Sequence, residues 1–116
     1  MSTPDPTFRI IALDLDGTLT NSQKEITPRT MQSLIDVQRR GVRVVLASGR
    51  PVCGQRETAE QLQLARYDGY IMAFGGGTLV QCSTSRFIDS VHIPHHLLPH
   101  IIHQATSQGF DLLSYQ

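Results

Sequence analysis

The sequence predicts an α/β fold built on a parallel sheet. Three short apolar runs, at residues 8–13, 42–47 and 70–74, alternate with two segments of helical periodicity. Strands that alternate with helices in this way form parallel sheets with right-handed crossovers. Ligands bind such sheets beside the carboxyl ends of the strands, and each of these runs is followed there by acidic, polar or glycine residues.

The first predicted strand, residues 8–13, ends directly before an acid. A helix is predicted at about 28–40, because Thr27 is a good cap residue and Pro28 suits the first helical position. Its apolar face holds Met31, Leu34, Ile35 and Gln38. Gly41 stands where a helix stops, so this segment connects the first strand to the second.

The second predicted strand, residues 42–47, is an almost continuous β-branched run, which is typical of a strand covered by helices on both faces. Residues 52–64 carry a weaker helical pattern. The third strand, residues 70–74, ends at the glycines 75–77. The order of elements to this point is βαβαβ.

Beyond these glycines the connections change from crossovers to a hairpin. Residues 78–82 and 87–92 are predicted as two short antiparallel strands around a polar turn. A helix follows from about residue 96 and ends at Gly109. Residues 110–115 are predicted to begin another strand.

The composition supports a folded core and excludes several classes of function. Of the 116 residues 40% are apolar, and ten Lys and Arg balance ten Asp and Glu, so neither nucleic acid nor an anionic membrane is favoured as a partner. No apolar run has the roughly 18 residues of a membrane span, and residues 1–7 lack the features of a signal peptide, so we expect a cytoplasmic protein. Cys53 and Cys82 lack metal-ligand spacing and are predicted to be small buried hydrophobes.

Two acids at the end of the first strand form the candidate chemical centre. Asp14 and Asp16 are two residues apart, so the period of a strand sends both side chains to the same side. Carboxylates this close raise each other's pKa unless a cation lies between them, which indicates a shared proton or bound Mg²⁺. Gly17 permits a sharp turn, and Thr18 is both a local hydrogen-bonding residue and a candidate phosphate-binding residue.

The run Ile-Ala-Leu-Asp-Leu-Asp-Gly-Thr-Leu-Thr at 11–20 resembles the first motif of the haloacid dehalogenase (HAD) superfamily of phosphatases. The run Leu-Ala-Ser-Gly-Arg-Pro at 46–51 is similar to the second motif of its Cof-like branch. The resemblance implies a HAD-like, Rossmann-type parallel sheet of which this chain carries the first half. It also implies a Mg²⁺-dependent enzyme that hydrolyses the phosphate monoester of a small metabolite.

The resemblance also implies roles for single residues. Asp14 attacks the phosphoryl group and forms an aspartyl-phosphate, while Asp16 protonates the leaving alcohol and then activates water. The Asp14 carboxylate and the Asp16 backbone carbonyl hold Mg²⁺, and Ser48 hydrogen-bonds the transferring phosphoryl oxygens. The backbone N–H groups of Gly49 and Arg50 lie at a strand-to-helix turn that favours anions, and the Arg50 side chain suits a bidentate contact to a phosphate or a carboxylate.

Two other functions stay open. A phosphomutase of the same superfamily passes the group from the aspartyl-phosphate to a sugar hydroxyl instead of water. A non-catalytic module would keep the first half of the fold to bind phosphate or to dimerise.

The resemblance divides the chain at residue 77. Residues 1–77 match the N-terminal part of the HAD-like core, and residues 78–116 match the beginning of an α/β cap domain. The lysine and the Gly-Asp-x-x-x-Asp segment that complete the family's site do not follow, so we expect a longer protein. Without the later strands, the first strand is an exposed edge carrying Ile10 and Ala12, which indicates pairing with a second copy of the chain.

Five histidines lie within residues 92–103. On a helix, His96, His100 and His103 share a face at a spacing that could ligate zinc. The interpretations are a solvated helix face or cap interface, a zinc site and a pH sensor. The first is favoured because no acid accompanies the histidines.

Overall fold

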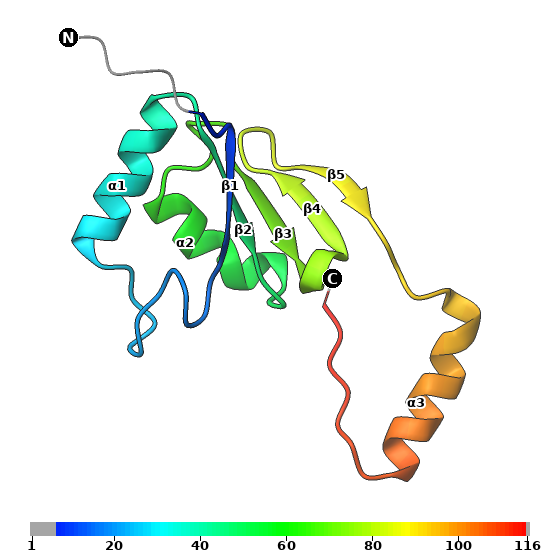
Figure 1. Ribbon diagram of the computed structural model, residues 1–116. Coiled ribbons are helices and arrows are strands. Elements are labelled where there is room, and N and C mark those ends of the chain that lie inside the picture. Colours follow the sequence, from blue (N-terminus) through cyan, green and yellow to red (C-terminus); the bar gives the residue numbers. More distant parts are fainter. Residues whose placement is uncertain (1–6, 116) are drawn as a thin grey trace, which may run out of the picture.

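The computed structural model describes residues 7–115, which contain one five-stranded sheet (Figure 1). The strands lie in chain order: β1 (Ile10–Asp14), β2 (Arg43–Ala47), β3 (Tyr70–Ala73), β4 (Thr78–Gln81) and β5 (Arg86–Ser90). The first three are parallel, and β4 and β5 continue the sheet as an antiparallel hairpin. This arrangement confirms the predicted α/β fold.

The helices are α1 (Pro28–Arg39), α2 (Arg56–Gln61) and α3 (Leu98–Ser107), with short 3₁₀ helices at Val52–Gln55, Phe74–Gly76 and His95–Leu97. Helices α1 and α3 begin and end close to their predicted positions, whereas α2 is shorter than the predicted segment 52–64. Thr27 caps α1, because its Oγ1 accepts the Thr30 N–H at 3.3 Å, and Pro28 takes the first helical position. Gly41 follows α1 with a φ of 89°, a left-handed conformation that suits glycine.

Both crossover helices pack on one face of the sheet, and that face holds the core. Its buried cluster consists of Leu15, Leu19, Ile26, Val44, Leu46, Ala59, Leu62, Leu64, Ile71, Ala73 and Val80. On the opposite face, Val45, Tyr70 and Met72 are only half-buried. The expectation that β2 is covered on both faces is therefore wrong for the described residues, because both crossovers turn to the same side of the sheet.

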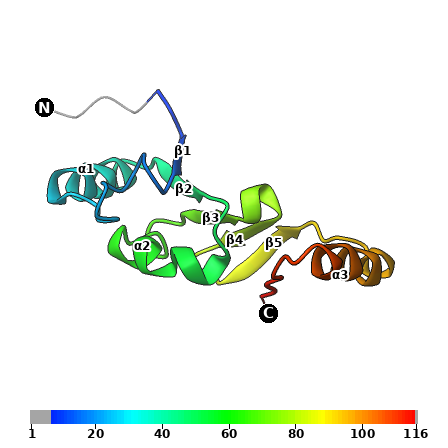
Figure 2. The same ribbon diagram turned by 90° about the horizontal axis from the view of Figure 1, so that it is seen from below.

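Beyond β5 the chain leaves the sheet as an arm, residues 91–115. Figure 2 shows α1 and α3 at opposite ends of the molecule, whose extents are 65 × 31 × 21 Å. The strand predicted at 110–115 is absent from this part of the described chain, because no neighbouring strand supplies its hydrogen bonds. The Tyr115 ring instead returns to the Phe74 ring, with 6.0 Å between the centroids.

The predicted domain boundary at residue 77 stays a prediction. The sheet continues through it, since Thr78 of β4 pairs with Ala73 of β3. In residues 7–115 no helix combines the length and the apolar character needed to cross a bilayer.

Candidate active site

The parallel register brings the predicted site residues to one edge of the sheet. Asp14 is the last residue of β1 and pairs with Ala47, the last residue of β2. The loop that begins at Ser48 therefore lies beside the turn that follows Asp14. Asp14 is exposed at this edge, where a ligand can reach its carboxylate.

The turn after β1 combines side chains buried in the core with side chains exposed to solvent. Leu15 and Leu19 are buried in the core, while Asp16 is exposed. Gly17 takes a φ of 78°, which lets the backbone reverse between the two leucines. The local hydroxyl bond expected of Thr18 is instead made by Thr20, whose Oγ1 donates to the Leu15 carbonyl at 2.9 Å, and Thr18 is left exposed.

Arg50 holds Asp16 in a bidentate ion pair. Its Nε and Nη2 donate to the Asp16 carboxylate oxygens at 2.8 and 2.5 Å. The hydrogen bonds to Arg50 hold the pKa of the Asp16 carboxyl below its usual range. Of the phosphate and carboxylate contacts predicted for Arg50, the structure thus contains the carboxylate contact.

The loop after β2 begins with Ser48, a residue that is 8% exposed. The Ser48 N–H donates to the Met72 carbonyl at 3.1 Å, and the Ser48 carbonyl accepts the Gly75 N–H at 3.0 Å. Ser48 Oγ accepts the Arg50 N–H at 3.1 Å, so its own proton is available for another acceptor. The Arg50 N–H is occupied by this bond, which leaves the Gly49 N–H as the available backbone donor of the predicted pair.

The helix after this loop differs from the predicted one. It opens as a 3₁₀ helix at Val52, and the α-helical part begins only at Arg56. The favourable dipole expected at an α-helical N-terminus beside Ser48 is therefore small. The buried Gln55 side chain holds this loop, because its amide donates to the Arg50 and Met72 carbonyls. The sequence pattern did not predict this role, since a glutamine in a weak helical segment is usually exposed.

A cavity of about 450 Å³ opens next to this edge of the sheet. Pro51 and Phe74 line it, and they adjoin the Ser48–Arg50 loop because the Phe74 N–H donates to the Arg50 carbonyl. The rest of its lining includes Arg56, Phe87, His92 and Tyr115. Aromatic walls beside the Arg56 guanidinium suit an organic group that bears negative charge.

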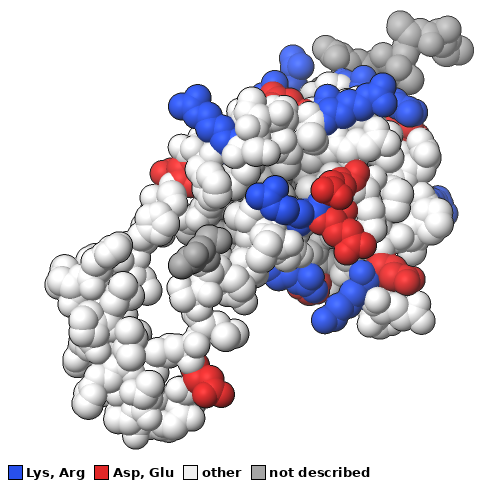
Figure 3. Space-filling model, turned by 180° about the vertical axis from the view of Figure 1, so that it is seen from behind, with Lys and Arg blue, Asp and Glu red and all other residues white. Residues whose placement is uncertain are grey.

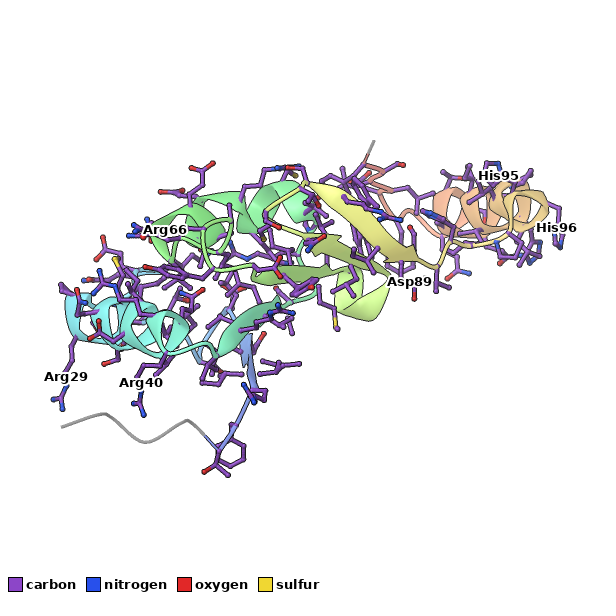
Figure 4. All side chains as sticks on the ribbon, turned by 90° about the horizontal axis from the view of Figure 1, so that it is seen from above. Arg29, Arg40, Arg66, Asp89, His95 and His96 are labelled. Carbon is purple, nitrogen blue, oxygen red and sulfur yellow. The ribbon has the colours of Figure 1, made fainter. Side chains whose placement is uncertain are left out.

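Two acids lie at the site, and within residues 7–115 no group of three or more His, Cys, Asp and Glu residues could hold a metal ion. Carboxylate and carbonyl oxygens are the donors that Mg²⁺ prefers, and this ion keeps several waters beside one or two carboxylates. The oxygens of Asp14 and Asp16 fit that pattern. The predicted zinc alternative at the histidines has no support, and Figure 4 shows His95 and His96 on the arm, away from the sheet.

Known proteins are similar to this chain in sequence and in fold. The family model described as haloacid dehalogenase-like hydrolase matches residues 11–116. This chain belongs to the haloacid dehalogenase-like hydrolases. The family predicted from the two motifs is thereby confirmed.

Individual HAD-like relatives agree with this assignment. A crystal structure of a HAD-like hydrolase from Bacteroides thetaiotaomicron superimposes with a TM-score of 0.83 and 37% identity, over 87% of this chain and 38% of that one. A Streptococcus pyogenes protein named as a candidate phosphatase is 33% identical over 70% of this chain and 30% of its own length. The Bacillus subtilis 5-amino-6-(5-phospho-D-ribitylamino)uracil phosphatase YcsE is 35% identical over 54% of this chain and 25% of its own. The chain spans about a third of the length of the curated relatives that it matches first.

Proposed function

We propose that the complete protein hydrolyses the phosphate monoester of a small metabolite through an aspartyl-phosphate on Asp14. The observation that supports this most is the meeting of Asp14, the Asp16–Arg50 pair and the Ser48 hydroxyl at one sheet edge. Phosphoryl transfer needs a nucleophile, a group that moves a proton, and donors for the phosphoryl oxygens. These residues supply each of them.

Asp14 attacks phosphorus and Asp16 moves the protons. The pair with Arg50 keeps Asp16 ionised, which suits the second step, in which a carboxylate takes a proton from water. In the first step Asp16 gives a proton to the leaving oxygen, so its carboxyl group must be protonated before this step. Arg50 therefore has to release the carboxylate first, and Asp16 then takes up a proton from water. The phosphoryl oxygens of the bound substrate offer the Arg50 guanidinium a second anionic partner.

Ser48 and the Gly49 N–H bind the phosphoryl oxygens. The Ser48 oxygen is held by the Arg50 N–H, so its proton can point toward the incoming group. Asp14 and the Asp16 carbonyl would hold Mg²⁺, which when bound neutralises charge on the equatorial oxygens. Thr18 is exposed on the same turn, and we propose it as a further residue that contacts the phosphate.

The cavity beside the loop takes the organic part of the substrate. Its volume of about 450 Å³ is in the range of small-molecule sites. The relative YcsE is named as a phosphatase of 5-amino-6-(5-phospho-D-ribitylamino)uracil. That name supports a substrate small enough for this cavity.

The decisive experiment is Asp14→Asn in the full-length protein, assayed with a panel of phosphorylated metabolites. We expect turnover to fall by about 10⁴-fold, since the nucleophile is lost. Asp36→Asn on α1 is the control and should keep wild-type turnover, because Asp36 contacts Gln32 and Arg39 only through exposed side chains. Hydrolysis that survives in Asp14→Asn contradicts the proposal, and conversion of one hexose phosphate into another would identify the phosphomutase instead.

A further inference from the structure

Gln55 joins the loop after β2 to the end of β3. Its side chain is fully buried at the end of the 3₁₀ helix Val52–Gln55. The amide Nε2 donates to the Arg50 carbonyl at 3.1 Å and to the Met72 carbonyl at 3.2 Å. One amide group therefore spans two segments of the candidate active site.

The same two carbonyls already tie this loop to β3. The Met72 carbonyl accepts the Ser48 N–H, and the Arg50 carbonyl accepts the Phe74 N–H. Gln55 adds a second donor to each oxygen, which has two lone pairs. Four hydrogen bonds thus enclose residues 48–50, so the backbone beneath Ser48 and Arg50 is held at both ends.

The chemistry of Gln55 fits this role in one orientation. Its amide NH₂ carries two protons and faces two carbonyl oxygens, whereas the reversed amide would set an oxygen against both. Its Oε1 is buried without a hydrogen-bond partner among the described residues. Leaving that oxygen unpaired costs free energy, which the two donated bonds offset.

We propose that Gln55 is a positioning residue for phosphoryl transfer, an inference that rests on the function proposed above. It holds the loop so that the Ser48 hydroxyl and the Arg50 guanidinium reach the phosphoryl group that Asp14 attacks. Gln55 itself touches no reacting atom. Misplacement of such groups by about 1 Å lowers a rate by about 100-fold.

Gln38 provides a matched control at the other end of the sheet. It is also buried, its Nε2 donates to the Leu62 carbonyl at 2.8 Å, and its Oε1 likewise has no partner among the described residues. Helix α1 runs back from the edge that carries Asp14 toward the start of β2 (Figure 1), so Gln38 near its end lies away from the active site.

The test compares Gln55→Leu and Gln55→Glu with Gln38→Leu and Gln38→Glu in the full-length protein. Leucine removes the donors at similar volume, and glutamate keeps the shape but replaces the NH₂ group with an acceptor. Three quantities are measured: the melting temperature, the hydrogen exchange of the Ser48 and Phe74 backbone amides by NMR, and kcat and KM with p-nitrophenyl phosphate.

We expect all four variants to melt at lower temperature. In the Gln55 variants amide exchange at Ser48 and Phe74 should accelerate and kcat should fall, each by about tenfold or more, while the Gln38 variants keep both near wild type. Equal exchange rates and equal kcat in the two pairs would overturn the proposal. If the wild-type protein hydrolyses no phosphomonoester, the proposed function fails, and the exchange comparison alone decides whether Gln55 positions the loop.

Discussion

Asp16 and Arg50 are 34 positions apart in the chain, and two hydrogen bonds join their side chains. The alternation of strands and helices was enough to predict that the segments containing Asp14 and Ser48 follow neighbouring parallel strands at one edge of the sheet. The pattern could not predict that the Arg50 guanidinium pairs with the Asp16 carboxylate. This ion pair depends on how the loop after β1 and the loop after β2 approach each other. Gln55 escaped prediction for the same reason, since both of its partners are backbone atoms of other segments.

We expect Arg50→Gln to raise the pKa of Asp16 toward its ordinary value of 3.8. In the wild type the carboxylate stays ionised as the pH falls through 3.8 and protonates only below it, because Arg50 stabilises the charged form. Carboxyl ¹³C NMR titration of the 116-residue chain measures this pKa. Arg43→Gln is the control, since Arg43 pairs with Asp68 at 3.0 Å. An Asp16 pKa that is unchanged in Arg50→Gln would show that the ion pair does not form in solution.

The two thiols should differ in reactivity. The prediction that both are buried is wrong for Cys53, which is exposed, while Cys82 is half-buried and burial raises its pKa to about 11. A raised pKa leaves less of the Cys82 thiol as thiolate at pH 8, and the thiolate is the form that reacts. We therefore expect Cys53→Ser, which leaves the half-buried Cys82, to react with Ellman's reagent more slowly than Cys82→Ser, which leaves the exposed Cys53. Equal rates would refute the burial of Cys82.

Local sequence patterns predicted a strand or helix correctly where the described chain supplies the neighbouring element that it packs against or pairs with. Thr27, Pro28 and Gly41 mark the ends of α1 within a residue of the predicted bounds. The predicted strand at 110–115 failed because a strand needs a neighbour, and none lies beside this segment in the described structure. Local patterns therefore predict a strand's tendency, while its formation depends on the rest of the sheet.

The cap of α1 supports a prediction about stability. Thr27→Ala removes the side-chain oxygen that accepts the Thr30 N–H, so we expect a loss of about 1 kcal/mol in the free energy of unfolding. That loss lowers the melting temperature by about 4 °C in a domain of this size, measured by calorimetry of the 116-residue chain. Thr27→Ser keeps the oxygen and should melt near wild type. If serine and alanine lower the melting temperature equally, the cap bond is not what stabilises the helix end.

The charged side chains are distributed unevenly over the molecule. Figure 3 shows Lys, Arg, Asp and Glu gathered over the body that contains the sheet, while the arm is mostly uncharged. On the arm, Leu98 and Ile102 of α3 are exposed, as is Phe110 beyond it. The sheet is open as well, because β1 pairs with β2 on one side and with no other strand of the described residues. A chain with these surfaces has two different ways to associate, through a strand edge or through apolar side chains.

The first of these ways gives a prediction for the 116-residue chain. β1 has no lysine or proline to block pairing, and its Ile10 side chain is 61% exposed, so we expect concentration-dependent self-association through this edge in sedimentation velocity. Ile10→Lys places a charge on the edge and should restore the monomer. Ile102→Lys removes a side chain that is 50% exposed on α3 and should leave association unchanged, because no strand edge is altered. A wild-type chain that stays monomeric at about 100 µM, or association abolished only by Ile102→Lys, would exclude pairing through β1.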